Sequence, residues 1–184
     1  MTKNTLLILP LIALVIAGFA GQAFADLIGD TVTINYLFPD INTVFQTLGT
    51  GTVTAGGFTT NSFGQHDFEV FGSEITLTNV FGSDVNFLSG TFNGYQMIND
   101  TGTPPITGVT VAFSDVSGFD ASRVTFDATD VWLNMHDLTT TPGLDIALDL
   151  QFGPRSVPEP SALLLLGSGF AALGAVAWRQ HRRK

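Results

Sequence analysis

The stretch DIALDLQF, from Asp145 to Phe152, decides the fold class of this 184-residue chain. Apolar and polar residues alternate along it without a break, and the apolar set is Ile146, Leu148, Leu150 and Phe152. Successive side chains of a β-strand point to opposite faces, so a period of two is typical of a half-buried strand. The stretch predicts such a strand, whose other face carries Asp145, Asp149 and Gln151.

Alternation of the same kind recurs through the middle of the chain. It is found at Val32, Ile34 and Tyr36, at Val109, Val111 and Phe113, and within residues 67–71, 74–78, 123–127 and 131–135. Turn-forming clusters such as TAGG, NDTGTPP and TTTPG separate these runs, and no segment shows a sustained helical stripe. We therefore predict an all-β fold of roughly eight to ten strands, an antiparallel β-sandwich or jelly roll, with a barrel as the alternative.

Aromatic residues in residues 26–156 are mainly phenylalanines. There are 13 of them, and the other aromatics are Tyr36, Tyr95 and Trp132. Because phenylalanine has no polar group, we expect most of these rings to fill the space between two sheets. Trp132 is opposite in phase to Val131 and Leu133, which allows two interpretations: packing in the core, which we favour, or an exposed platform for a sugar.

The charge of residues 26–156 excludes one class of partner. This segment holds 15 of the 16 acidic residues but only two of the seven basic ones, Arg123 and Arg155, so its formal charge is −13. Such a surface repels phosphate backbones, which excludes nucleic acid as a partner. The chain also has no cysteine, which excludes disulfides, thiolate metal ligands and thiol nucleophiles.

Residues 1–25 have the layout of a cleavable secretory signal peptide. Lys3 precedes an apolar stretch over about residues 6–19, and the triplet Ala-Phe-Ala follows at 23–25. We place the cleavage between Ala25 and Asp26, with an uncleaved membrane helix as the alternative. Residues 26–156 then form one exported domain.

The C-terminal residues 157–184 have three parts. Residues 161–178 carry no charge, and a helix of that length reaches roughly 27 Å, close to the hydrocarbon thickness of a bilayer. This predicts a transmembrane helix. Residues 157–160, VPEP, cannot be helical, so we expect them to be extended and accessible at the outer face of the inner membrane. The end of the chain, residues 179–184, supplies the topology signal that stays in the cytoplasm, with the cations Arg179, Arg182, Arg183 and Lys184.

Pro158, Glu159 and Pro160, the apolar segment that begins SALLLLG and the basic end together resemble the PEP-CTERM protein-sorting signal. The resemblance covers about the last 28 residues. It implies a Gram-negative cell that makes exopolysaccharide and biofilm, in which a membrane-embedded exosortase recognises these three residues and processes the protein. The tail would be a transient anchor in the inner membrane, and the domain would end at the cell surface or outside the cell. An ordinary single-span anchor behind a proline-rich stalk is the alternative.

Part of the exported domain, residues 92–100 and 118–138, is similar in pattern to an uncharacterised domain of PEP-CTERM proteins. This second resemblance implies no activity, so the chemistry of the domain has to be read from its residues.

Few residues of the exported domain point to catalysis or to a metal. No GxSxG motif occurs, and His66 and His136 are each followed by an aspartate that would face the opposite side of a strand. For Ca²⁺ there is no D-x-D-x-D-G loop, and the candidate ligands are Asp127 and Asp130, which flank a short turn. We prefer the interpretation that the acidic residues form a solvated surface, and we expect no cofactor.

Two functions follow from these observations. The favoured one is a non-enzymatic surface or extracellular-matrix protein that is adhesive or contacts extracellular polysaccharide. The alternative is a secreted carbohydrate-active enzyme on a jelly-roll scaffold, which would need two close carboxylates in a cleft beside an exposed Trp132.

Overall fold

The computed structural model describes residues 25–155 and Gly169, and the alternating segments form strands as predicted. Within residues 25–155 there are twelve strands and one short 3-10 helix: β1 (Thr31–Leu37), β2 (Val44–Thr52), β3 (Phe58–Ser62), β4 (His66–Val70), β5 (Glu74–Asn79), β6 (Val85–Asn86), β7 (Gly94–Asn99), β8 (Ile106–Ser114), η1 (Ala121–Arg123), β9 (Val124–Phe126), β10 (Asp130–Asn134), β11 (Thr139–Thr140) and β12 (Gly143–Phe152). The number exceeds the predicted one because the two-residue strands β6 and β11 are too short to show any alternation.

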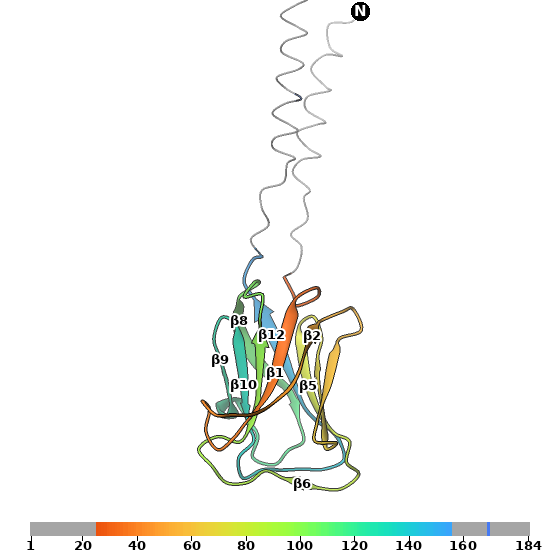
Figure 1. The fold of residues 1–184 in the computed structure, drawn as a ribbon, viewed down its shortest axis with the longest axis vertical. Helices are drawn as coiled ribbons and strands as arrows, with labels where there is room; N and C mark the ends of the chain where they lie inside the picture. The colour runs from red at the N-terminus through yellow and green to blue at the C-terminus, as the bar shows by residue number, and fades with distance from the viewer. Residues whose placement is uncertain (1–24, 156–168, 170–184) are drawn as a thin grey trace, which may run out of the picture.

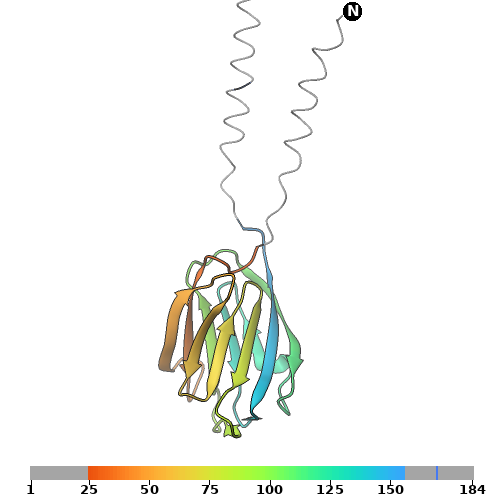
Figure 2. The ribbon, with the colours of Figure 1, turned by 90° about the vertical axis from the view of Figure 1, so that its right-hand side faces the viewer.

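Ten of these strands form two antiparallel sheets that pack face to face (Figure 1). Sheet I has the strand order β2-β1-β7-β10-β9, and sheet II has the order β3-β4-β5-β12-β8. Figure 2 looks onto sheet II, where β12 lies between β5 and β8. The all-β prediction is confirmed, and the arrangement of the two sheets is that of a sandwich.

The core between the sheets is built mainly from aliphatic side chains. Ile146 and Leu148 of β12 are fully buried, and Leu150 is nearly so, as their alternation predicts. Sheet I contributes the opposite wall through fully buried residues at every second position of its strands: Val32, Ile34, Met97, Val131 and Leu133. Burial of these faces is the main favourable contribution to folding.

The expectation that most phenylalanines fill the core is wrong. Four of the 13 are buried, namely Phe68, Phe87, Phe92 and Phe119. Five are exposed, namely Phe45, Phe63, Phe81, Phe113 and Phe126. The exposed rings lie in loops, on edge strands and at the ends of strands, where the sheets do not cover them. The largest fully buried side chain is Tyr95 of β7, whose ring packs against Phe68 and Phe87.

Asp145 departs from the predicted pattern on β12. The pairing of β12 with β5 shifts register between Leu144 and Ile146, which leaves Asp145 at a bulge. Its side chain is completely buried, and Oδ2 accepts a hydrogen bond of 2.6 Å from the backbone amide of Asn79. The prediction that Asp145 shares an exposed face with Asp149 is therefore wrong, because alternation in sequence cannot show a bulge.

Both ends of the described domain lie at the same end of the sandwich (Figures 1 and 2). Arg155 Nη2 donates to Asp30 Oδ2 at 2.8 Å and to the carbonyl oxygen of Asp26 at 2.7 Å. At the opposite end, which we call the distal end, lie the strand ends and loops of residues 38–45, 63–65, 80–93, 115–123 and 135–142. The segment that leads to the C-terminal tail thus leaves from the end away from these loops.

Candidate functional site

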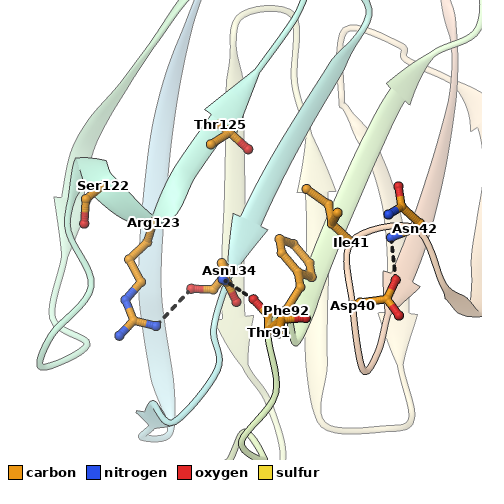
Figure 3. A pocket seen from close by; sticks show the side chains of 9 residues that line it. All are labelled: Asp40, Ile41, Asn42, Thr91, Phe92, Ser122, Arg123, Thr125 and Asn134. Atoms are coloured by element: carbon orange, nitrogen blue, oxygen red, sulfur yellow. Dashed lines mark hydrogen bonds between the residues drawn. The ribbon is translucent and has the colours of Figure 1, made fainter.

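A shallow depression of about 360 Å³ lies at the distal end of sheet I. Figure 3 shows its lining, which comes from four separate parts of the chain: Asp40, Ile41 and Asn42; Thr91 and Phe92; Ser122, Arg123 and Thr125; and Asn134. Most of these side chains are polar, and Ile41 and Phe92 add apolar surface. Pockets that hold small polar ligands combine apolar walls with a few fixed polar groups in this way.

Arg123 is the cation of this depression, and it is held in place by backbone carbonyls. Its Nη1 donates to the carbonyl oxygen of His136 at 2.8 Å and is 3.5 Å from that of Asn134. Nε and Nη2 of Arg123 donate to no acceptor within residues 25–155, and the side chain is half-exposed. The guanidinium therefore has donors left for a ligand.

The loop of residues 38–43, which forms one wall, is stabilised by its own aspartate. Asp40 Oδ1 accepts hydrogen bonds from the amide of Asn42 at 2.9 Å and from the Thr43 hydroxyl at 3.1 Å. On the opposite side, Asn134 Nδ2 donates to the carbonyl oxygen of Thr91 at 3.4 Å. The walls are thus fixed by hydrogen bonds within the protein rather than by a ligand.

Trp132 lies on the outer face of sheet I beside this depression, and the preferred prediction that it packs in the core is wrong. It is half-buried, whereas its neighbours Val131 and Leu133 are fully buried on the inner face. In the pairing of β10 with β9, Trp132 is opposite Thr125, which lines the depression. The indole is thus on the solvent side of sheet I but partly covered, which agrees better with the alternative interpretation than with packing in the core.

A row of hydrogen-bonded polar side chains runs across the same outer face toward Trp132. Thr47 Oγ1 donates to Asn35 at 2.8 Å, Asn35 Nδ2 donates to Gln96 at 3.1 Å, and Gln96 Nε2 donates to Asp130 Oδ1 at 2.7 Å. Gln96 is the cross-strand partner of Trp132 on β7. These hydrogen bonds hold the side-chain amide of Gln96, next to Trp132, in one orientation.

The two calcium candidates lie at the opposite end of β10, in the turn between β9 and β10. Asp127 Oδ1 accepts hydrogen bonds from the amides of Thr129 and Asp130, each at 2.8 Å. These hydrogen bonds hold the pKa of Asp127 below its usual value, and the one from Thr129 contributes most. Asp130 uses Oδ1 for Gln96 and Oδ2 for the Thr129 hydroxyl. Both carboxylates therefore organise the turn, and no group of three or more ligand side chains occurs in the part of the chain that the structure describes.

The two histidines within residues 25–155 have different environments. His66 is buried, and its Nε2 is 2.7 Å from the Thr140 hydroxyl. Burial lowers its pKa to about 4, so the ring is neutral at physiological pH. Asp67, the next residue, faces outward, as the strand geometry predicts. His136 is half-exposed near the depression, and its Nδ1 is 3.2 Å from Asp137 Oδ2.

Exposed apolar side chains are concentrated at the distal end. Phe45, at the start of β2, and Phe63, in the turn between β3 and β4, have ring centroids 6.1 Å apart, and both contact Tyr36. Other exposed apolar residues of the distal loops and strand ends are Ile41, Val44, Val80, Phe81 and Leu88. Exposed apolar patches such as that of Phe45 and Phe63 are typical of a contact site.

The sequence did not predict the depression, because its lining is assembled from segments far apart in the chain. Arg123 was the one available signal, since it is one of two cations among residues 26–156. Trp132 was recognised as a candidate and placed in the right phase, opposite to Val131 and Leu133, but core packing was favoured for it.

The observed domain is an acidic β-sandwich with one face that carries the half-buried indole of Trp132 and fixed polar groups. Beyond it, residues 156–183 match the model of the PEP-CTERM protein-sorting motif. The C-terminus of the chain carries this motif, which implies an exported protein that an exosortase processes and that is sorted to the cell surface. Neither a curated protein nor a solved structure matches the chain.

Several predictions concern residues outside the described part of the chain. These are the signal peptide before Ala25, the motif residues Pro158, Glu159 and Pro160, the helix of residues 161–178 apart from Gly169, and the basic end, residues 179–184. Among the described residues, no helix is both long and apolar enough to cross a membrane.

Proposed function

We propose that the mature protein is a non-enzymatic component of the cell surface or extracellular matrix, and that its distal end makes adhesive or glycan contacts. The observation that carries this proposal is the placement of exposed groups. The open apolar side chains and the depression lie at the distal end, whereas Asp26 and Arg155 meet at the other end. A domain anchored or released through its C-terminal tail would therefore present this surface to its surroundings.

The lining of the depression favours binding over hydrolysis. Its carboxylate is Asp40, and no second acidic residue lines it. Glycoside hydrolysis ordinarily uses two carboxyl groups on either side of the scissile bond, one as acid and the other as base or nucleophile. Asp40 is moreover engaged by the amide of Asn42 and the hydroxyl of Thr43. These observations support the non-enzymatic function over the carbohydrate-active enzyme.

The proposal is tested by retention of the exported protein in the matrix. Phe45 and Phe81 are 62% and 55% exposed, so replacing both with serine should leave the core intact. We expect the double variant to be exported normally but to shift from the cell surface and matrix fraction into the medium. Phe126, which is 42% exposed at the other end of the sandwich, is the matched control, and its replacement with serine should not alter retention.

Two results would contradict the proposal. One is equal retention of the double variant and the wild-type protein. The other is release of reducing sugar from matrix polysaccharide by the purified protein, which would favour the enzyme instead.

A further inference from the structure

The depression at Arg123 and the indole of Trp132 are neighbours on the outer face of sheet I. Thr125 links them, because it lines the depression and is the cross-strand partner of Trp132. Asn134 also links them, since it lines the depression and lies two residues from Trp132 on the same face of β10. A ligand in the depression could therefore extend over the indole.

We propose that this surface is a binding site for a neutral glycan chain. The inference rests on the proposed function, since it names the ligand class and the residues for a glycan contact. The chain would lie in the depression, with hydroxyl groups facing Arg123 and Thr125 at one side and Asn42 at the other (Figure 3). Another sugar of the same chain would lie against the indole of Trp132.

The chemistry of the lining fits hydroxyl groups. Nε and Nη2 of Arg123 are donors without an acceptor among residues 25–155, and the side chains of Asn42 and Thr125 make no hydrogen bond within the same range. A sugar hydroxyl both donates and accepts, so it can satisfy a guanidinium, an amide or another hydroxyl. The C–H faces of a sugar ring are apolar and flat, which matches the large apolar surface that an indole offers.

The charges around Arg123 favour a neutral ligand over an acidic one. Asp40 lines the depression, and Asp120 and Asp137 lie close enough to Arg123 for its charge to help lower their pKa, although hydrogen bonds from Ser122 and Ser89 respectively contribute more. The domain as a whole has a formal charge of −13 over residues 26–156. An anionic chain would meet repulsion from all three carboxylates, which a single guanidinium does not offset.

Fluorescence of Trp132 gives a direct test. The chain has two tryptophans, Trp132 and Trp178, so the full-length protein with Trp178→Phe, in detergent, leaves Trp132 as the reporter. The probes are hexasaccharides of neutral glucan, mannan and galactan, with oligogalacturonate as the acidic comparison. We expect a saturable change in Trp132 emission with at least one neutral probe and none with oligogalacturonate.

Variants then locate the site. We expect Arg123→Ala and Trp132→Ala to weaken binding by about tenfold or more, as measured by affinity electrophoresis in gels that contain the bound polysaccharide. Arg123→Ala could also disturb the loop, because Arg123 donates to the carbonyl oxygens of Asn134 and His136. Thr125→Ala is a milder change at an exposed position and should weaken binding severalfold. Thr110→Ala, an exposed threonine of β8 on sheet II, is the control and should bind like the wild-type protein.

Three results would overturn the assignment: no response to any neutral probe at millimolar concentration, tighter binding of oligogalacturonate, or unchanged binding by both Trp132→Ala and Thr125→Ala. The outcome is separable from that of the proposed function. If matrix retention depends on Phe45 and Phe81 but no glycan binds, the glycan site is contradicted and the proposed function is not. If a neutral glycan binds but the double variant is retained like the wild-type protein, the proposed function is contradicted and the glycan site is not.

Discussion

Arg155 and Asp30 form an ion pair, with Nη2 and Oδ2 2.8 Å apart, that joins positions 125 residues apart in the sequence. The side chain of Asp30 is 7% exposed and that of Arg155 is 36% exposed. Burial raises the pKa of Asp30, and the nearby charge of Arg155 acts against that rise. The pair therefore fastens the C-terminal end of the domain to its start and neutralises a buried carboxylate.

Replacement of Arg155 with glutamine should destabilise the domain by about 1 to 2 kcal/mol, because it leaves the Asp30 carboxylate buried without its cation. The expected loss is smaller than the roughly 3 to 5 kcal/mol for breaking a fully buried pair, since Arg155 is partly exposed to solvent. Urea denaturation of wild-type protein, Arg155→Gln, Asp30→Asn and the double variant measures the coupling. A coupling energy near zero would contradict a stabilising role for the pair.

The second prediction concerns pH and the buried groups His66 and Asp145. Burial lowers the pKa of His66 from 6.5 to about 4, and the stability that neutral His66 contributes is lost as the pH falls through this range. Burial raises the pKa of Asp145 from 3.8 to about 6, and the stability of its protonated form is lost as the pH rises through this range. Between pH 4 and 6 the two contributions, each on the order of 3 kcal/mol, oppose one another.

Replacing either residue should therefore expose the pH dependence of stability that the other one causes. Relative to wild type, we expect the unfolding free energy of Asp145→Asn to fall as the pH is lowered from 6 to 4, and that of His66→Gln to rise. Urea denaturation in steps of pH measures both slopes. If both variants keep the wild-type pH dependence, neither group titrates differently in the folded and unfolded states.

The third prediction concerns Gly94, at the start of β7. A Cβ at this position would lie 1.9 Å from the carbonyl oxygen of Leu133 on the neighbouring strand β10, so Gly94→Ala has to displace backbone. We expect a loss of more than about 3 kcal/mol, or a failure to fold. Gly56→Ala is the control, since its nearest contact would be 3.7 Å from Thr54 Oγ1, and it should be nearly neutral in thermal denaturation. Similar melting temperatures for the two variants would contradict the close approach of β7 and β10.

The fourth prediction concerns sorting. Glu159 is the one acidic residue of the motif in residues 156–183 and stands between Pro158 and Pro160, so Glu159→Ala should remove the feature that the exosortase recognises. We expect unprocessed protein to accumulate in the membrane fraction, as measured by fractionation and immunoblotting. Glu74→Ala, in strand β5 of the exported domain, is the control and should be processed normally. Normal processing and surface delivery of the Glu159 variant would contradict the role of the motif.

The strands were predictable because alternation has a direct physical cause. Ile146 and Leu148 had to face the core, since each strand has one covered face. The same rule gave the right phase for Trp132, opposite to Val131 and Leu133, yet phase alone does not say whether the outer face is covered. Nothing in the sequence shows that the outer face of sheet I is open at this point.

Other features depend on tertiary contacts that a linear pattern does not contain. Asp145 is buried because a bulge and the amide of Asn79 hold it, and neither follows from its neighbours in sequence. The depression requires Asp40, in the loop after β1, and Arg123, at the end of η1, to line one surface although they are more than eighty positions apart. The sorting motif needs no tertiary contact, which explains why it could be recognised from residues 157–160 and the segment that follows.

The scarcity of cations has a consequence for survival outside the cell. Proteases of trypsin-like specificity cut after lysine or arginine, and residues 26–155 offer them Arg123 and Arg155 alone. Both guanidinium groups are already held, Arg123 by the carbonyl oxygen of His136 and Arg155 by Asp30. A domain with so few cleavage points should resist extracellular proteases of this specificity.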